Sequence, residues 1–364
     1  MTTLEPPVAV IAEVTHRCPL SCGYCSNPLA LARVGAELNT ETWLRVIDEA
    51  AAVGVLHFHF TGGEPLSRRD LPALVRRASA RGLYTNLITS GVQLSEAVLG
   101  ALLEAGIDHI QLSIQDVEPA AADASGGYAG GHARKLAAAV RIVAADLPLT
   151  LNFVVHRGNI GRVAQMLALG DQLGASRIEV AHVQYYGWAL LNRAALLPSR
   201  AQLDVATAAV AEARSRFASR IVVDYVTPDY FAVRPKACMG GWGRRAINIS
   251  PDGLALPCHA AQTLPGFSFP SVRSQSLAEI WWDSDAFARF RGVDWVPELC
   301  RGCADFETDF GGCRCQAFAL TGDATRTDPT CALSPDHGIL ARAVEEAGAS
   351  AAFLIPRRIT GVPA

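Results

Sequence analysis

The placement of the cysteines constrains the fold of this chain more than any other feature of its sequence. Three of the ten cysteines, Cys18, Cys22 and Cys25, lie within eight residues, and none follows until Cys238. The later cysteines are Cys238, Cys258, Cys300, Cys303, Cys313, Cys315 and Cys331. A secreted domain held together by disulfides is short, with cysteines spread along its length. Clustered thiols in a longer chain instead predict metal ligation in a reducing compartment.

Length, composition and charge set further limits. The chain has 364 residues, of which 50% are hydrophobic and 18% charged, so we expect a globular protein of one large domain or two. The net charge of −3 argues against general attraction to nucleic acid or to an anionic membrane. The start lacks a positively charged segment, and no stretch has the roughly 18 apolar residues of a membrane span. We therefore expect a cytoplasmic protein without a nucleic-acid or membrane partner.

Strand-like and helix-like segments alternate through the first half of the chain. Short apolar strands are expected at 8–14, 55–60, 84–89, 109–114, 149–155 and 177–183. Repeated βα units with apolar strands predict a parallel sheet, either a barrel or a doubly wound sheet, and six strands would make an incomplete barrel. A helix at 202–217 and a strand at 221–225 follow. The predicted domains are an α/β domain at 8–225, a cysteine-rich domain at 226–337, and a C-terminal tail at 338–364 with a helix and a loose end.

The first cysteine cluster follows directly on the first expected strand. Its spacing is C-x3-C-x2-C, and three thiolates on a short loop can hold three irons of a [4Fe–4S] cluster while the fourth iron stays open. The alternatives are buried structural thiols or a zinc site, for which His16 would be the fourth ligand.

A second motif lies one βα unit further on, at Thr61-Gly62-Gly63-Glu64-Pro65. Two glycines let the backbone approach a ligand closely, and their N–H groups can bind a carboxylate. The carboxylate of Glu64 can accept hydrogen bonds from an ammonium group. Such a loop suits the amino-acid end of a small zwitterion.

Together the two motifs resemble those of the radical S-adenosylmethionine (SAM) superfamily, and the resemblance covers roughly 8–183. It implies an enzyme with a partial (β/α)6 TIM-like barrel, in which Cys18, Cys22 and Cys25 hold a [4Fe–4S] cluster and SAM binds the open iron. In this resemblance Gly62, Gly63 and Glu64 meet the SAM amino group and Tyr24 lies next to its adenine. The full set of expected SAM-binding residues is Tyr24, Gly62, Gly63, Glu64, Pro65, Ser113, Gln115 and Asn152. The last three have an equal alternative as ordinary polar residues at strand ends.

The later cysteines resemble the SPASM domain, which holds auxiliary iron–sulfur clusters. Asp309 stands where the usual pattern has a cysteine, and Cys315 is an added thiol. Seven cysteines and Asp309 supply the eight ligands of two clusters. We expect Cys238, Cys258, Cys313 and Cys315 to hold one cluster, and Cys300, Cys303, Asp309 and Cys331 to hold the other. The alternative is that Asp309 is a solvated loop residue and that the second site is incomplete or binds water.

Further stretches, at 154–159, 184–189 and 237–243 among others, are similar to the members of this family that act in pyrroloquinoline quinone biosynthesis. This resemblance implies a carbon–carbon cross-link between a glutamate and a tyrosine of the precursor peptide PqqA. It also implies the peptide chaperone PqqD and an electron donor such as flavodoxin. Only about seven residues precede the first strand, so a separate chaperone is expected.

Several alternatives stay open at this level. The first alternative is that the chain is another radical SAM–SPASM peptide or sulfatase maturase. The second, from a different class, is a non-enzymatic zinc-binding scaffold. Tyr185, Tyr186 and Trp188 line the peptide groove or simply pack in the core. No catalytic base is predicted.

Overall fold

A sheet of nine strands organises the computed structural model, which describes residues 4–349 and 353–358. Its order is β7-β6-β5-β4-β3-β2-β1-β8-β9, and every neighbouring pair is parallel except β8 with β9. The strands are β1 (Ala9–Thr15), β2 (His57–Gly62), β3 (Tyr84–Thr89), β4 (His109–Ile114), β5 (Leu149–Val155), β6 (Arg177–His182), β7 (Val222–Val226), β8 (Ala246–Ile249) and β9 (Ala255–Leu256). The predicted partial barrel is confirmed.

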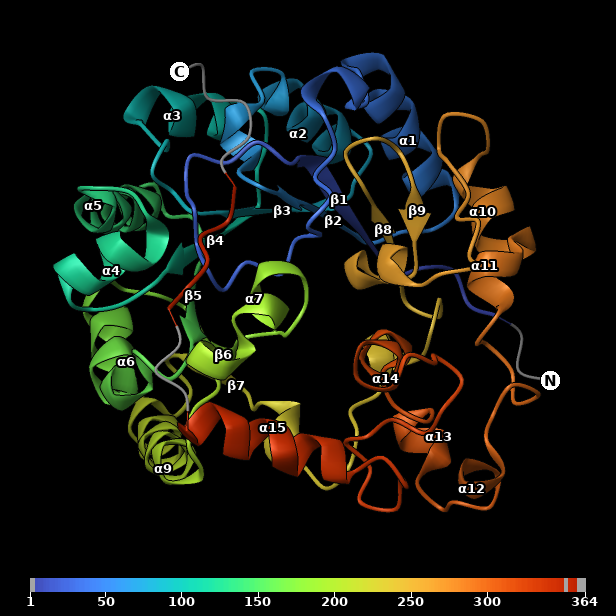
Figure 1. Cartoon of the computed structure of the whole chain (residues 1–364). Helices are drawn as coiled ribbons and strands as arrows, with labels where there is room; N and C mark the ends of the chain where they lie inside the picture. The colour runs from blue at the N-terminus through green and yellow to red at the C-terminus, as the bar shows by residue number, and fades with distance from the viewer. Residues whose placement is uncertain (1–3, 350–352, 359–364) are drawn as a thin grey trace.

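Helices cover the outer face of the sheet (Figure 1). They are α1 (Thr40–Ala52), α2 (Leu71–Ala80), α3 (Glu96–Glu104), α4 (Pro119–Gly126), α5 (Gly131–Ala144), α6 (Val163–Gln172) and α9 (Arg200–Phe217). Their apolar stripes meet alternate strand residues, as when Trp43 and Ile47 of α1 share one core with Phe58 and Phe60 of β2. Because this core lies outside the barrel, the other strand residues are left to face its interior.

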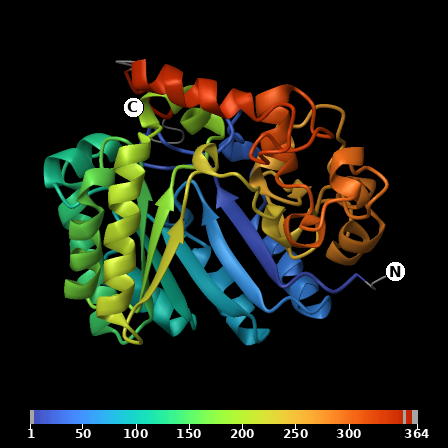
Figure 2. The ribbon, with the colours of Figure 1, turned by 90° about the horizontal axis from the view of Figure 1, so that it is seen from below.

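The C-terminal region joins the same sheet. Strand β8 pairs with β1, in a register that places Ala246 beside Ala9. The remaining helices are α7 (Gly187–Leu191), α8 (Arg193–Leu196), α10 (Leu277–Asp283), α11 (Asp285–Ala288), α12 (Glu298–Arg301), α13 (Phe306–Asp309), α14 (Arg314–Thr321) and α15 (Gly338–Ala349). Short 3-10 helices are η1 (Val34–Ala36), η2 (Pro65–Ser67), η3 (Ile160–Arg162), η4 (Asp229–Phe231), η5 (Cys238–Gly240) and η6 (His259–Thr263). Figure 2 shows the parallel strands pointing toward the side on which α15 lies. The domain boundaries at 225 and 337 stay a prediction.

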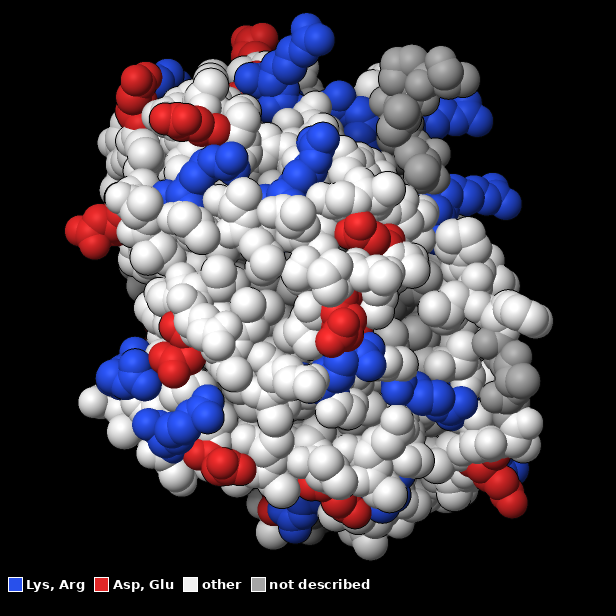
Figure 3. Space-filling view, turned by 90° about the vertical axis from the view of Figure 1, so that its left-hand side faces the viewer, with Lys and Arg blue, Asp and Glu red and all other residues white. Residues whose placement is uncertain are grey.

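The surface carries both signs of charge. On the face shown in Figure 3, basic and acidic side chains are interspersed among neutral ones. Among the helices that the structure describes, none is long and apolar enough to cross a membrane.

Candidate functional site

Three thiols gather around a cavity at the C-terminal ends of the first four strands. Cys18, Cys22 and Cys25 lie in the loop after β1, here called the cysteine loop, and line a cavity of about 180 Å³. Ligands of parallel α/β sheets bind at this end of the strands. The other lining residues are Leu20, Tyr24, Asn27, Thr61, Gly62, Gly63, Ile88, Thr89, Ser90, Ser113, Gln115 and Arg357.

Burial makes two of these thiols, Cys18 and Cys25, weaker acids. It raises the pKa of Cys18 to about 12 and that of Cys25 to about 11, and the positive charge of Arg357 opposes both shifts. A thiol must lose its proton to bind iron, so metal binding here is coupled to proton release. Within the described residues, no three His, Cys, Asp or Glu side chains are placed to hold a single metal ion. Thiols around a cavity suit a cluster better, since each thiolate then binds a different iron.

His16, the fourth ligand of the zinc alternative, is engaged elsewhere. Its Nδ1 accepts a hydrogen bond from the N–H of Ala32 at 2.9 Å, and its Nε2 lies 3.0 Å from Oε2 of Glu13. Both ring nitrogens are therefore used within the protein, which disfavours a zinc site made by His16 and the three cysteines.

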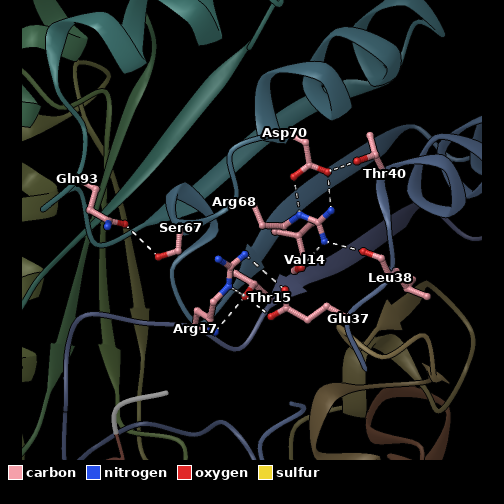
Figure 4. A network of polar contacts seen from close by, with 10 residues as sticks. All are labelled: Val14, Thr15, Arg17, Glu37, Leu38, Thr40, Ser67, Arg68, Asp70 and Gln93. Atoms are coloured by element: carbon pink, nitrogen blue, oxygen red, sulfur yellow. Dashed lines mark hydrogen bonds and ion pairs between the residues drawn. The ribbon is translucent and has the colours of Figure 1, made fainter. Parts of the chain in front are cut away.

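A polar network behind the cavity fixes the end of β1 and the start of the cysteine loop (Figure 4). The buried guanidinium of Arg68 donates to the carbonyl oxygens of Val14 and Leu38 at 3.0 and 2.9 Å. Arg17 donates its backbone N–H and its Nε–H to Oγ1 of Thr15 at 3.0 and 3.1 Å. Arg68 directly follows η2, so its bonds join the end of the glycine-containing loop (residues 61–65 and η2) to β1 and to Leu38. The N–H of Glu64 in turn donates to the carbonyl oxygen of Arg17 at 2.7 Å, which holds the glycine-containing loop against the cysteine loop.

The two glycines allow close approach of one loop to the other. The N–H of Gly63 donates to the carbonyl oxygen of Thr15 at 2.7 Å. This N–H is therefore used within the protein, and the binding of SAM by Gly62 and Gly63, which both line the cavity, stays a prediction. Gly62 has φ +128°, which favours glycine, and its carbonyl oxygen accepts from Nδ2 of Asn27 at 3.3 Å.

Alanine at Gly63 is expected to destabilise the protein by about 1–3 kcal/mol and to reduce its bound iron. A Cβ there would lie 2.4 Å from the carbonyl oxygen of Arg17 and 2.7 Å from that of His16, and neither backbone atom can move aside alone. Denaturant unfolding and iron analysis measure both effects. At Gly100 in α3 an added Cβ would meet no atom within 4 Å, so Gly100→Ala should be neutral or stabilising. Equal stability of the two variants would contradict the prediction.

Glu64 joins the glycine-containing loop, of which it is part, to the end of β3. Its fully buried carboxylate accepts from the N–H of Leu66 at 3.1 Å, from Oγ1 of Thr89 at 2.7 Å and from the N–H of Ser90 at 2.9 Å. Neither Glu64 nor Pro65 is among the residues that line the cavity. The contacts of Glu64 in the structure thus serve the loops, and its binding to SAM stays a prediction.

The polar residues at the later strand ends are only partly gathered at the cavity. Ser113 and Gln115 line it, and the buried Lys135 donates to the carbonyl oxygen of Ser113 at 3.2 Å and to Oε1 of Gln115. Asn152 lies beside Ser113 in the sheet but is not among the lining residues, and its Oδ1 has no hydrogen-bond partner among the described residues. Tyr24 lines the cavity as expected, and the roles of all these residues toward SAM stay predictions.

Four cysteines far apart in the sequence form a group in the C-terminal region. Sγ of Cys258 lies 3.6 Å from Sγ of Cys315, and hydrogen bonds join Cys238 to both Cys258 and Cys313. Hydrogen bonds from Cys238 and Cys315 lower the pKa of Cys258 and of Cys313 well below its usual value. These are the four thiols predicted for the first auxiliary cluster, and the structure brings all of them together.

The second predicted set also lies together. Cys300, Cys303, Asp309 and Cys331 line one small space of about 20 Å³. Asp309 is the last residue of α13, and its Oδ1 accepts from the N–H of Gly311 at 2.8 Å. This turn keeps the carboxylate beside the three thiols. Ligation by Asp309 stays a prediction, but the structure does not leave it as an isolated loop residue.

The segment that contains α7 links the two cysteine regions. The hydroxyl of Tyr186 lies 3.2 Å from Sγ of Cys313, and the N–H of Ala189 donates to the carbonyl oxygen of Cys25 at 3.0 Å. Tyr185 instead packs edge-on against another tyrosine ring, with 5.0 Å between centroids. The sequence left two roles open for these aromatic residues, lining a peptide groove or packing in the core. Tyr186 instead contacts a predicted cluster ligand.

Tyr186→Phe is expected to lower the reduction potential of the first auxiliary cluster by roughly 20–60 mV. The hydroxyl is placed to donate a hydrogen bond to the Cys313 sulfur, and such a bond, worth about 0.5–1.5 kcal/mol, stabilises the more electron-rich reduced state. A redox titration followed by electron paramagnetic resonance (EPR) measures the change. Tyr185→Phe is the matched control and should leave the potential unchanged. A potential that Tyr186→Phe does not lower would show that the hydroxyl donates elsewhere.

Sequence reasoning missed two residues that bind the cysteine loop. Asn192 is buried beside α8 and binds the cysteine loop, and Arg357 reaches the cavity from the C-terminal tail. Neither lies in a motif, and the only signal for Arg357 is the pair of arginines, Arg357 and Arg358, in a short tail.

Comparisons with known proteins agree with this geometry. A model of the radical SAM superfamily matches residues 12–168, and a model described as an iron–sulfur cluster-binding domain (SPASM) matches 238–304. The chain is 60% identical over 363 residues to the PqqA peptide cyclase of Granulibacter bethesdensis, covering 100% of this chain and 97% of that protein. It is 56% identical over 360 residues to the PqqA peptide cyclase of Gluconobacter oxydans, covering 99% and 100%. The fold is similar to that of Streptococcus suis SuiB bound to S-adenosylmethionine, with TM-score 0.76 and 17% identity over 90% of this chain and 78% of that one.

Proposed function

The chain belongs to the family of PqqA peptide cyclases, radical SAM–SPASM enzymes of pyrroloquinoline quinone biosynthesis, and on this premise we propose that it cross-links a glutamate and a tyrosine of PqqA. The bond would join the glutamate Cγ to a carbon of the tyrosine ring. The single observation that carries the proposal is the cavity at the strand ends, where three thiols from one short loop meet the glycine-containing loop.

An iron–sulfur cluster and SAM are the cofactors of this enzyme class, and we propose that Cys18, Cys22 and Cys25 hold a [4Fe–4S] cluster. When bound, cluster and SAM supply a carbon radical that removes a hydrogen atom from the substrate. The chain itself orients the start of the cysteine loop through Arg17 and fixes the end of β1, on which that loop follows, through Arg68. We propose that the two groups of C-terminal ligands hold two auxiliary clusters.

The proposed reaction balances as an oxidation of the peptide. One hydrogen atom leaves glutamate Cγ, the carbon–carbon bond forms, and one electron and one proton then leave the tyrosine ring so that it regains aromaticity. The peptide thus loses two hydrogen atoms in all. The electron needs an acceptor, and the auxiliary clusters are proposed for this role. The segment that contains α7 contacts both cysteine regions, through Tyr186 at Cys313 and through Ala189 at Cys25.

The partners and the compartment are also proposals. SuiB, a relative in fold, has been solved bound to its precursor peptide SuiA, which fits a peptide substrate for this fold. PqqD as peptide chaperone and flavodoxin as electron donor follow from the family. A cytoplasmic location is supported by the ten cysteines, none of which forms a disulfide.

The test is anaerobic incubation of the purified chain with SAM, a reductant, PqqA and PqqD, followed by mass spectrometry. We expect release of 5′-deoxyadenosine and a peptide lighter by two hydrogen atoms, with the loss located at one glutamate and one tyrosine. Formation of 5′-deoxyadenosine without change in PqqA would contradict the substrate and favour another peptide or sulfatase maturase. A colourless protein without iron after anaerobic purification would favour the zinc scaffold.

A further inference from the structure

The C-terminal tail returns to the cysteine loop after α15. Residues 353–358, here called the C-terminal strap, run past the ends of β4 and β5 and are drawn in red in Figure 1. Asn192 holds the strap and the cysteine loop together. Its Nδ2 donates to the carbonyl oxygens of Gly23 and Ile355 at 2.7 and 2.8 Å, and its Oδ1 accepts from the N–H of Ile355 at 2.7 Å. The strap is therefore a specific part of this site.

The strap carries a buried cation into the cavity. Arg357 is only 2% exposed and lines the cavity beside the three cysteines. Its backbone N–H donates to the carbonyl oxygen of Ser21 at 3.1 Å, and its Nη2 donates to that of His16 at 2.7 Å. The guanidinium also lies 5.8 Å from the centre of the Trp188 ring and forms a hydrogen bond with Cys25. Its Nε is buried and has no hydrogen-bond partner among the described residues.

No carboxylate of the described residues is paired with the charge of Arg357. Among the described residues it forms no ion pair with Asp or Glu, and its polar partners are backbone carbonyl oxygens and the Cys25 thiol. A buried cation without a counter-charge is costly. Its positive charge acts most directly on Cys18 and Cys25, whose thiolates it favours. A cluster held by three thiolates carries negative charge and gains one more on reduction, so it would supply the missing partner.

We propose that Arg357 is the counter-charge of the SAM-binding cluster, which it stabilises most in the reduced state, and that the Asn192-held strap positions it there. Arg357 is thus a positioning and electrostatic residue supplied from the far end of the chain. The proposal rests on the proposed function, because it requires the three cysteines to hold that cluster.

The test is a redox titration of the reconstituted full chain, followed by EPR, without SAM. The SAM-binding cluster is identified as the one whose signal changes when SAM is added afterwards. Arg357→Gln removes the charge and should lower the potential by at least 59 mV, which is a tenfold change in the one-electron equilibrium. Arg357→Lys keeps the charge and should keep a potential close to that of the wild type. The matched control is Arg358→Gln, since Arg358 is the exposed neighbour on the same strap and should leave the potential unchanged.

Three outcomes would overturn the proposal. The first is a wild-type potential in Arg357→Gln. The second is a shift that arises only after SAM is added, because the guanidinium would then act on the SAM carboxylate. The third is a shift of the potential by about 59 mV or more in Arg357→Lys, which keeps the charge. This variant also serves as the test if Arg357→Gln retains too little iron to titrate. Failure of the proposed function is seen separately, as a wild-type protein in which no EPR signal responds to SAM.

Discussion

Replacing Cys18, Cys22 and Cys25 together by alanine is expected to abolish both 5′-deoxyadenosine formation and cross-linking of PqqA. The three thiols are the cysteines that line the cavity, and the other seven lie in the two C-terminal groups. Without thiolates at this loop no cluster can be held there, so no electron reaches SAM. The loss should therefore be complete. Chromatography of the nucleoside product and mass spectrometry of the peptide measure it.

The same variant should keep the auxiliary clusters. Iron analysis should show the loss of one cluster's share, and the EPR signals that do not respond to SAM should persist. Ser26→Ala is a suitable control, because Ser26 follows Cys25 but is not among the residues that line the cavity. Residual 5′-deoxyadenosine from the triple variant, above that of a reaction without protein, would show that SAM is cleaved at another site.

Local sequence patterns were enough to predict the core of this fold. Each expected strand from 8–14 to 177–183 overlaps a parallel strand of the sheet, because buried parallel strands are short apolar runs whose ends are marked by glycines or polar residues. The pairing of β8 with β1 was not predicted. That pairing joins residues more than two hundred positions apart, and nothing in the local pattern of either strand specifies its partner.

In the candidate site, too, the features set by local motifs were predicted and those set by long-range contacts were not. The two cysteine motifs are local, and the structure gathers their members as expected. The positive φ of Gly62 and the close backbone contacts of Gly63 show why the loop needs its glycines, which the motif alone had ascribed to a ligand. Arg357 and Asn192 act through contacts made only in the folded chain, such as the bond from Arg357 to the carbonyl oxygen of His16, 341 positions away. No window of sequence contains both partners of such a contact.

Asp309→Ala is the second change for which a large effect is expected, with loss of the second auxiliary cluster's EPR signal and at least a tenfold loss of cross-linked peptide. Asp309 lines the same small space as Cys300, Cys303 and Cys331. Burial raises the pKa of the Cys300 thiol, and the negative charges of Cys331 and Asp309 raise it further. With Asp309 as the proposed ligand, removing its carboxylate would leave one iron of that cluster without a protein ligand and make the cluster labile. Iron analysis and EPR follow the cluster, and mass spectrometry follows the peptide.

Asp309→Cys separates ligation from a merely structural role. A thiolate gives more electron density to iron than a carboxylate does, so this variant should keep its iron and lower the cluster's potential by on the order of 100 mV. Asp305→Ala is the matched control, because Asp305 lies one turn earlier, beside α13, and pairs with Arg234 instead. If Asp309 only shapes the turn by accepting from the N–H of Gly311, both Asp309 variants should change stability while the potential of the retained cluster stays fixed. Because the potential of a cluster responds to the atoms bound to its iron, that result would show that Asp309 is not a ligand and that the second site has three protein ligands.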